Sequence, residues 1–489
     1  MWYTRRVKKH ENQGIWGRRM YRKRDKHQMT IYDFILPFSG KLQAENRWVK
    51  MAGIMPWELI EEIYARSFKD ERLDGRPPIT ARIAFGALYI KESENYTDER
   101  TVEHIAENAY MQYFLGLLEF NPSPLFDASM MTWFRKRFSA ADVARINEEL
   151  YLRMQRSHEE PPEGKNKGTM VLDATVAPAD IHYPTDLSLL NECRENTETM
   201  IETLWKHGQR SGHKTAYNRQ KAHVNYLSVQ KQRRPRKKAV QQGIGNQLVY
   251  VEKNLITLDR LLMEVAEGTL KQHDVTRLET IRKVAVQQRI HFENPKQSIQ
   301  ERIVNLRQPH VRPIVRGKAG AEVEFGQKLA FSVVDGFTFI EEQSWNNFSE
   351  GLSLKASAEK YRQRQGVYPE AILADKIYRN RENLAFCKAH GIRLSGPRLG
   401  RPKAAELEAD REQAYQDSCN RNIVESRNGI VKRRYGLSRI MAWLPQTALT
   451  EAAMNVLVMN AAHVLRVLLR FLKIHFVFPL RLLHCSALC

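Results

Sequence analysis

The chain has 489 residues, of which 42% are hydrophobic, so it is long enough for two or three folded units and too apolar for wholesale disorder. Its 77 lysines and arginines outnumber 56 acidic residues, and the formal net charge is +21. This surplus favours a polyanionic partner, because each neutralised phosphate releases condensed counterions. The composition therefore predicts a nucleic-acid-binding protein, with a ribosome-associated or simply basic protein as the alternative.

The cysteines, the first residues and a long apolar stretch near the C-terminus bear on the cellular compartment in which the protein is expected. Five cysteines are scattered without a C-x-x-C pair, which argues against a disulfide framework or a zinc ribbon and favours a reducing cytoplasm. The first residues are charged rather than apolar, so no signal peptide is expected. The long apolar stretch 453–483 is interrupted by basic residues, which favours a buried or amphipathic helix over a membrane span. We expect a cytoplasmic protein without membrane contact.

The N-terminal third combines a basic arm with a helical region. Residues 1–44 form the arm and its lead-in, and apolar residues recur at helical spacing over 45–160. Within that region, Ser129 can cap a short helix that ends on Arg135, Lys136 and Arg137. We expect a helical DNA-binding domain in which these three cations contact DNA; a surface helix with basic residues is the alternative.

Strand signals then alternate with a long helical segment. The run 168–177 is strand-like, and apolar stripes over 186–320 indicate an extended helical insertion, with a basic cluster over 231–238 as an exposed loop. Asp335-Gly336 between two β-rich runs predicts a hairpin. A short apolar run ends on Asp375, and helices are expected over about 420–434 and 447–472, before a tail over 466–489.

Three carboxylates stand out by their context. Asp173 lies in an apolar strand-like run, where an unpartnered carboxylate is costly to bury. Asp375 ends a second apolar run, and Glu425 shares one helical face with Arg421 and Lys432. Hard oxygen ligands of this kind hold paired Mg²⁺ ions in enzymes that act on phosphodiesters. Spacing alone does not single out these three, and Asp180, Asp186 and Asp335 are rivals, as is a purely structural role for each.

Ordered motifs around these residues resemble those of bacterial insertion-sequence DDE transposases. Leu172-Asp173-Ala174-Thr175, continuing over 181–187, is similar to their first-aspartate motif, and Ala374-Asp375 with Tyr378 is similar to the second. Arg421, Glu425 and Lys432 match the spacing of their Arg–Glu–Lys signature, but Ser418 stands where that signature carries a tyrosine. The N-terminal segments 77–78, 108–116 and 133–137 also resemble the family's DNA-binding domain, so the resemblance covers roughly residues 30–465.

The resemblance implies an α/β fold: an RNase H-like mixed sheet flanked by helices, with an all-α N-terminal domain and a long helical insertion. The catalytic core would comprise 165–185 and 321–465. It further implies that Asp173, Asp375 and Glu425 are catalytic and bind two Mg²⁺ or Mn²⁺ ions. Arg421, Lys432 and Arg433 would contact DNA.

The implied activity is cleavage at the ends of a mobile element, followed by attack of the freed 3′-hydroxyl on target DNA. The partners would be double-stranded DNA, as terminal inverted repeats and as target, and further copies of the chain in a homo-oligomer. The alternatives are a non-catalytic DNA-binding protein, including an inactivated transposase, and a nuclease that cuts without joining.

Overall fold

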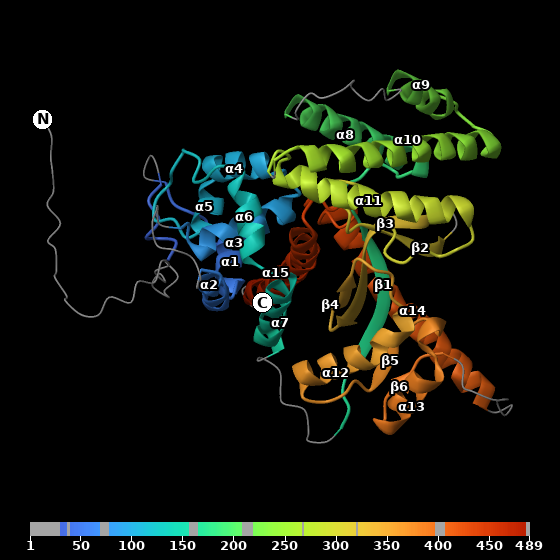
Figure 1. Cartoon of the computed structure of the whole chain (residues 1–489). Coiled ribbons are helices and arrows are strands. Elements are labelled where there is room, and N and C mark those ends of the chain that lie inside the picture. Colours follow the sequence, from blue (N-terminus) through green and yellow to red (C-terminus); the bar gives the residue numbers. More distant parts are fainter. Residues whose placement is uncertain are drawn as a thin grey trace, which may run out of the picture. The chain divides into compact units, whose positions relative to one another are not determined.

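The computed structural model describes residues 30–36, 40–68, 78–155, 165–207, 219–266, 268–318, 321–396 and 406–485. The expected basic arm over residues 1–28, Pro77 and the last residues of the expected tail lie outside them. The chain divides into two compact units, one comprising Met1–Lys91 with Tyr96–Phe138 and the other Glu92–Asn95 with Ser139–Cys489. Figure 1 shows the elements of both units, and each unit is described by itself.

The first unit is helical, and capping residues begin several of its helices. Asn46, Thr97 and Asn108 each accept a backbone N–H from the first turn, as expected for polar residues before an apolar run. Aromatic side chains around the buried Phe114 form part of its core. Its helices are α1 (Arg47–Ile54), α2 (Trp57–Arg66), α3 (Ala81–Glu94), α4 (Asp98–Glu107), α5 (Ala109–Phe114) and α6 (Met130–Arg137).

A six-stranded mixed sheet forms the centre of the second unit, in the order β2-β3-β1-β5-β6, with β4 also paired to β3. β1 runs antiparallel to β3 and parallel to β5, and β5 runs parallel to β6. The predicted hairpin is confirmed: β3 and β4 pair antiparallel across Asp335-Gly336. The strands are β1 (Thr169–Pro178), β2 (Arg312–Lys318), β3 (Ala321–Val334), β4 (Phe337–Ser344), β5 (Ala371–Leu373) and β6 (Arg393–Leu394).

Helices cover this sheet and bury its apolar residues. α14 contacts β1, β3 and β5, whereas α7 and α15 contact each other and β4. By length and composition, one helix in the described part of the chain could cross a membrane, over 445–469 of α15, but 61% of its most apolar window is buried inside the protein. The helices around the sheet are α7 (Ala140–Gln155), α12 (Ser353–Gln365), α13 (Arg381–Ala389), α14 (Glu406–Arg434) and α15 (Pro445–Cys485), with short 3-10 turns η2 (Glu350–Leu352) and η3 (Lys376–Tyr378).

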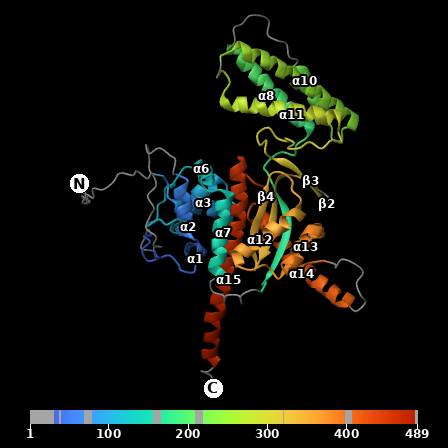
Figure 2. The ribbon, with the colours of Figure 1, turned by 60° about the horizontal axis from the view of Figure 1, so that its bottom comes forward.

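The insertion between β1 and β2 is a helical bundle (Figure 2). Its helices are α8 (Asp186–His207), α9 (Arg219–Gln230), α10 (Lys237–Glu264) and α11 (Gln272–Glu293). The apolar stripes predicted from the sequence meet in one buried cluster that includes Leu190, Leu248 and Ile281. These residues recur at helical spacing, so each helix presents one apolar face to the others.

Two domain limits differ from the sequence prediction. α7 was expected in the N-terminal domain over 45–160, but Asn147 on α7 donates to the Thr338 carbonyl of β4, so this helix packs with the second unit. β2 was expected inside the insertion ending at 320, but it pairs with β3 and belongs to the sheet. Both differences arise because long-range packing, which local periodicity does not report, assigns a segment to a core. The overall class is nevertheless confirmed: mixed α/β with a helical N-terminal region.

His310, which follows the helical insertion, is half-buried, and its environment predicts that stability depends on pH. The His310 ring packs edge-on against Trp345, with ring centroids 4.3 Å apart. Burial and then the Arg312 guanidinium lower the pKa of His310 from 6.5 to about 4. Between these two values the unfolded chain binds the proton that the folded chain excludes. We therefore expect the free energy of unfolding to fall as the pH drops from about 6.5 toward 4. Thermal unfolding at pH 7.5 and pH 5 measures this loss, which should be smaller in His310→Gln than in the wild type. Equal losses in the two proteins would contradict the role of His310.

Candidate active site

Asp173 lies on β1, and Asp375 follows the end of the neighbouring parallel strand β5. Val171 of β1 pairs with Leu373 of β5, and each aspartate follows two residues beyond its strand's member of that pair. Because adjacent strands are about 4.8 Å apart, this register brings the positions of the two aspartates close to each other, although Asp375 lies just beyond the end of β5. Asp173 is half-buried, whereas Asp375 is exposed and its side chain accepts the backbone N–H of Lys376 at 2.6 Å.

Helix α14 lies over the same face of the sheet. Val424 is buried against Val171 and Leu373, which fixes the helix above the paired strands. One turn later, Asn428 Nδ2 donates to Asp173 Oδ2 at 2.9 Å. The sequence placed Asn428 on the same helical face as Glu425 but gave no sign that it contacts the first aspartate. Asn428 therefore holds the orientation of that carboxylate.

Glu425 directly follows Val424 on α14, and its side chain is exposed. Among the described residues, no three Asp, Glu, His or Cys side chains form a group that could hold a metal ion. Helix α14 thus lies against the strands that carry the two aspartates, but Glu425 does not complete a compact cluster with them in this conformation.

Tyr378 reports the electrostatics around the two aspartates. Its side chain is buried at the end of η3. Burial raises the pKa of Tyr378 above its usual range, and the negative charges of Glu350, Asp173 and Asp375 raise it further. The same phenol therefore lies within electrostatic range of all three carboxylates. Sequence reasoning missed Glu350, which belongs to η2 and pairs with Lys328 Nζ at 3.0 Å, because no local pattern marks it.

The cations predicted on α14 occupy different environments. The half-buried Arg421 has a buried Nε that makes no hydrogen bond within the described residues. Lys432 is half-buried, and the exposed Arg433 donates from its Nε to the Gly429 carbonyl at 3.2 Å. Ser418, at the position of the family's tyrosine, is exposed.

The three rival aspartates are engaged in structural contacts. Asp180 pairs with Arg439, and Asp186 pairs with Arg302 at 2.6 Å. Asp335 occupies the hairpin turn with a φ of 49° and accepts the Tyr151 hydroxyl at 2.8 Å. Each of these three carboxylates therefore has a structural partner close to it in the fold.

Helix α6 presents only part of its basic end to solvent. Arg135, predicted to contact DNA, is 7% exposed and pairs with Asp98, so its charge is used inside the unit. Arg137 donates to the Ser67 carbonyl at 2.7 Å and lies over the Phe68 ring, which also ties it to the fold. Lys136 Nζ lies 4.4 Å from the centroid of the Trp133 ring, whose side chain is 53% exposed. Lys136 with Trp133 is the accessible basic–aromatic pair on this helix.

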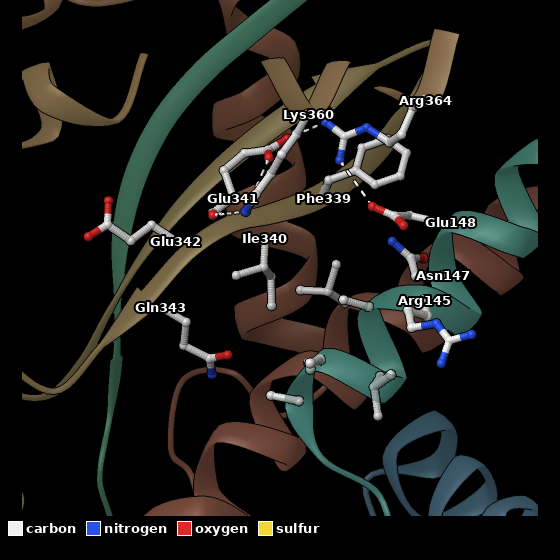
Figure 3. Close-up of a pocket in the computed structure, with 16 residues that line it drawn as sticks. Arg145, Asn147, Glu148, Phe339, Ile340, Glu341, Glu342, Gln343, Lys360 and Arg364 are labelled. Atoms are coloured by element: carbon white, nitrogen blue, oxygen red, sulfur yellow. Dashed lines mark hydrogen bonds and ion pairs between the residues drawn. The ribbon is translucent and has the colours of Figure 1, made fainter. Parts of the chain in front are cut away.

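A cavity of about 340 Å³ lies elsewhere in the second unit, between α7, β4, α12 and α15 (Figure 3). Several of its charged groups pair with each other: Arg364 binds Glu341 at 2.5 Å and approaches Glu148 at 3.6 Å. None of the candidate carboxylates lines it. These internal ion pairs give the cavity a structural role.

The donor set around Asp173 fits a divalent cation. Asp173 and Asp375 supply hard oxygen ligands of the type that Mg²⁺ and Mn²⁺ prefer. The Asn428 Oδ1 is buried and accepts no hydrogen bond from any residue that the structure describes, although it lies beside the first carboxylate. An unsatisfied buried oxygen is costly, and a nearby cation would offset that cost.

Comparison with known proteins identifies the family. Residues 372–461 match the family model described as "Transposase DDE domain", and residues 37–137 match the one described as "Transposase domain (DUF772)". The chain belongs to the bacterial insertion-sequence DDE transposases. The first match contains Asp375 and Glu425, and the second contains the whole of α6. Members of this family act on DNA and use divalent metal ions, so this transposase has DNA as its substrate class.

A curated relative adds a partial match. The transposase is 30% identical over 163 residues to "Uncharacterized protein ORF8 in nfe locus" of Rhizobium meliloti, which covers 33% of this chain and 73% of that protein. No solved structure matches the transposase.

Proposed function

We propose that this transposase binds the terminal inverted repeats of its element, cleaves DNA there and joins the freed 3′-hydroxyl to target DNA, with Asp173, Asp375 and Glu425 holding two Mg²⁺ or Mn²⁺ ions. The register of β1 against β5 supports this proposal, because it brings the positions of the two aspartates near each other although the whole insertion separates them in the chain. Glu425 would join the two aspartates by a change in the conformation of its side chain or of α14. Its carboxylate is exposed, so solvent leaves room for that movement.

The residues around the carboxylates would position the reacting strand. Bound metal would activate the attacking oxygen and stabilise the leaving oxygen at the scissile phosphate. Asn428 would keep the Asp173 carboxylate in one orientation through its hydrogen bond. Arg421, Lys432 and Arg433 would bind phosphate oxygens along α14, and Lys136 with Trp133 would contact DNA from the N-terminal unit.

The joining reaction also bears on the oligomeric state of the transposase and on where it acts. Two element ends must be held together for joining, so the transposase would act as a homo-oligomer on double-stranded DNA in the bacterial cytoplasm. Residues 45–138 would recognise the ends. The sheet with its helices would cut and join, and the bundle over 186–307 would be an accessory domain of that core.

Plasmid DNA that carries the sequences on both sides of the transposase gene tests the activity. We expect Mg²⁺- or Mn²⁺-dependent nicks at the element ends, which sequencing gels would map. Duplexes with a pre-cleaved 3′-hydroxyl end should then become covalently joined to a second plasmid. Cutting without joining would identify a nuclease on the same core, and absence of both reactions with either metal would contradict the proposal.

A second candidate is a transposase-derived protein that binds DNA ends without cutting. Two observations favour it: Glu425 forms no compact group with the aspartates, and Ser418 stands in the tyrosine position. For that protein we expect specific binding of the ends, unaffected by chelators, and no nicks under any metal condition. Binding assays with and without EDTA, run beside the cleavage assay, separate the two candidates.

A further inference from the structure

A strongly basic loop joins α9 to α10 in the insertion. Over 231–238 it carries six cations, and every residue of the segment is exposed. Within the part of the chain that the structure describes, no ion pair involves any of the six. They are Lys231, Arg233, Arg234, Arg236, Lys237 and Lys238.

Three arginines on the helices of the same bundle illustrate pairing with carboxylates. Arg194 pairs with Glu198 at 2.5 Å, and Arg289 pairs with Glu252 at 2.5 Å. Arg282 likewise pairs with an aspartate. These arginines are neutralised inside the bundle, whereas within the described residues no carboxylate pairs with the cations of the loop.

Two of these six cations belong to the start of the helix that follows. Lys237 and Lys238 lie in the first turn of α10, which contains no acidic residue. Cations at this end of a helix are repelled by the positive end of its dipole. The bundle would be more stable with acidic residues here, so the cations are better explained by an external anion.

The loop lies at the end of the bundle that joins the sheet. Three contacts run in the same order along α8 and α10: Leu187 lies beside Gly243, Arg194 bonds Gln247 and Thr197 bonds Asn254. The two helices are therefore parallel, and the start of α10 lies beside the start of α8. α8 begins eight residues after β1 ends, and β1 carries Asp173.

We propose that the loop 231–238 binds the phosphate backbone of the DNA that flanks the cleavage site, independently of its sequence. Six flexible or forked cations that form no ion pair with the described residues match a row of phosphates, and an exposed segment tracks such a row without reading bases. The inference rests on the proposed function for its partner. It adds a contact surface separate from the cations of α6 and α14, at the end of the insertion that joins the sheet.

Salt dependence of binding tests this surface, and it does not require cutting. The loop variant R233Q/R234Q/R236Q is compared with K253Q/K271Q/K283Q, which removes the same charge from exposed positions on α10, α11 and the residue before α11. Affinity for duplexes extending about two helical turns beyond the element end is measured over a range of salt concentrations. The variant R233K/R234K/R236K keeps the charge and serves as the rescue.

The slope of log affinity against log salt is negative, and we expect it to become shallower by about 2.7 in the loop variant. This change corresponds to about 0.9 for each lost phosphate contact. Its deficit relative to the wild type should shrink about 40-fold between 50 and 200 mM salt. The lysine control and the arginine-to-lysine variant should keep the wild-type slope. A wild-type slope in the loop variant, or an equal fall in the lysine control, would overturn the proposal.

Duplex length separates this inference from the proposed function. On duplexes that end about half a turn beyond the cleavage site, the loop variant should bind and nick like the wild type, because the missing DNA is what the loop contacts. A wild-type protein that binds with the expected slope but never nicks would contradict the catalytic proposal alone. If the loop variant bound short and long duplexes equally poorly, its effect would not depend on flanking DNA, and the proposed contact of the loop with that DNA would be refuted.

Discussion

Replacing Asp173, Asp375 or Glu425 by the corresponding amide is expected to lower DNA cleavage at least about 1,000-fold, which corresponds to about 4 kcal/mol of transition-state stabilisation. The amide keeps the shape of each side chain but removes the negative charge that binds a divalent cation. Affinity for the element ends should change less than about threefold, because the proposed phosphate-binding cations remain. Single-turnover cleavage and equilibrium binding of the same duplex measure the two effects.

Two further variants make this result specific. Asp180→Asn removes an acidic residue near the end of β1 that pairs with Arg439, and it should cleave like the wild type. Asn428→Ala should slow cleavage about 10- to 100-fold, because it frees the Asp173 carboxylate without removing it. Weaker Mn²⁺ binding by electron paramagnetic resonance should accompany each loss. Cleavage within tenfold of the wild type in all three amide variants would refute the carboxylate assignment.

Arg135→Gln is expected to destabilise the N-terminal helical unit by about 3 kcal/mol. The guanidinium is almost completely buried and pairs with Asp98, so the substitution leaves a partly buried carboxylate without its counter-charge. Lys136→Gln, at the next position, should change stability by less than about 0.5 kcal/mol, because its amine projects over the exposed Trp133 ring. Urea unfolding monitored by hydrogen exchange in α4 and α6 measures both.

The double variant D98N/R135Q tests the cause of that loss. Removing both charges should recover much of the stability, because no unpaired carboxylate is left. Lys136→Gln should in turn weaken DNA binding without unfolding the unit, whereas Arg135→Gln should weaken it only as far as the unit unfolds. A stable Arg135→Gln protein with reduced DNA affinity would instead return Arg135 to the DNA interface.

The insertion helices and the β3–β4 hairpin could be predicted from the sequence because their signals are local. Leu190, Leu248 and Ile281 recur within apolar stripes that define buried helix faces, and Asp335-Gly336 specifies a turn through its own backbone preferences. The limits of α7 and β2 could not be predicted in this way, because each segment joins the second unit through partners distant in the chain.

By itself, the sequence determined a basic, DNA-directed protein with an α/β core, a helical insertion and ordered family motifs around Asp173, Asp375 and Glu425. Tertiary structure alone decided that β1 and β5 pair in parallel, which sets the two aspartates together, and that Asn428 fixes one of them. It also decided that Arg135 turns inward. The physical reason is that strand register and side-chain burial depend on contacts across the fold, whereas composition and periodicity report only what each segment prefers alone.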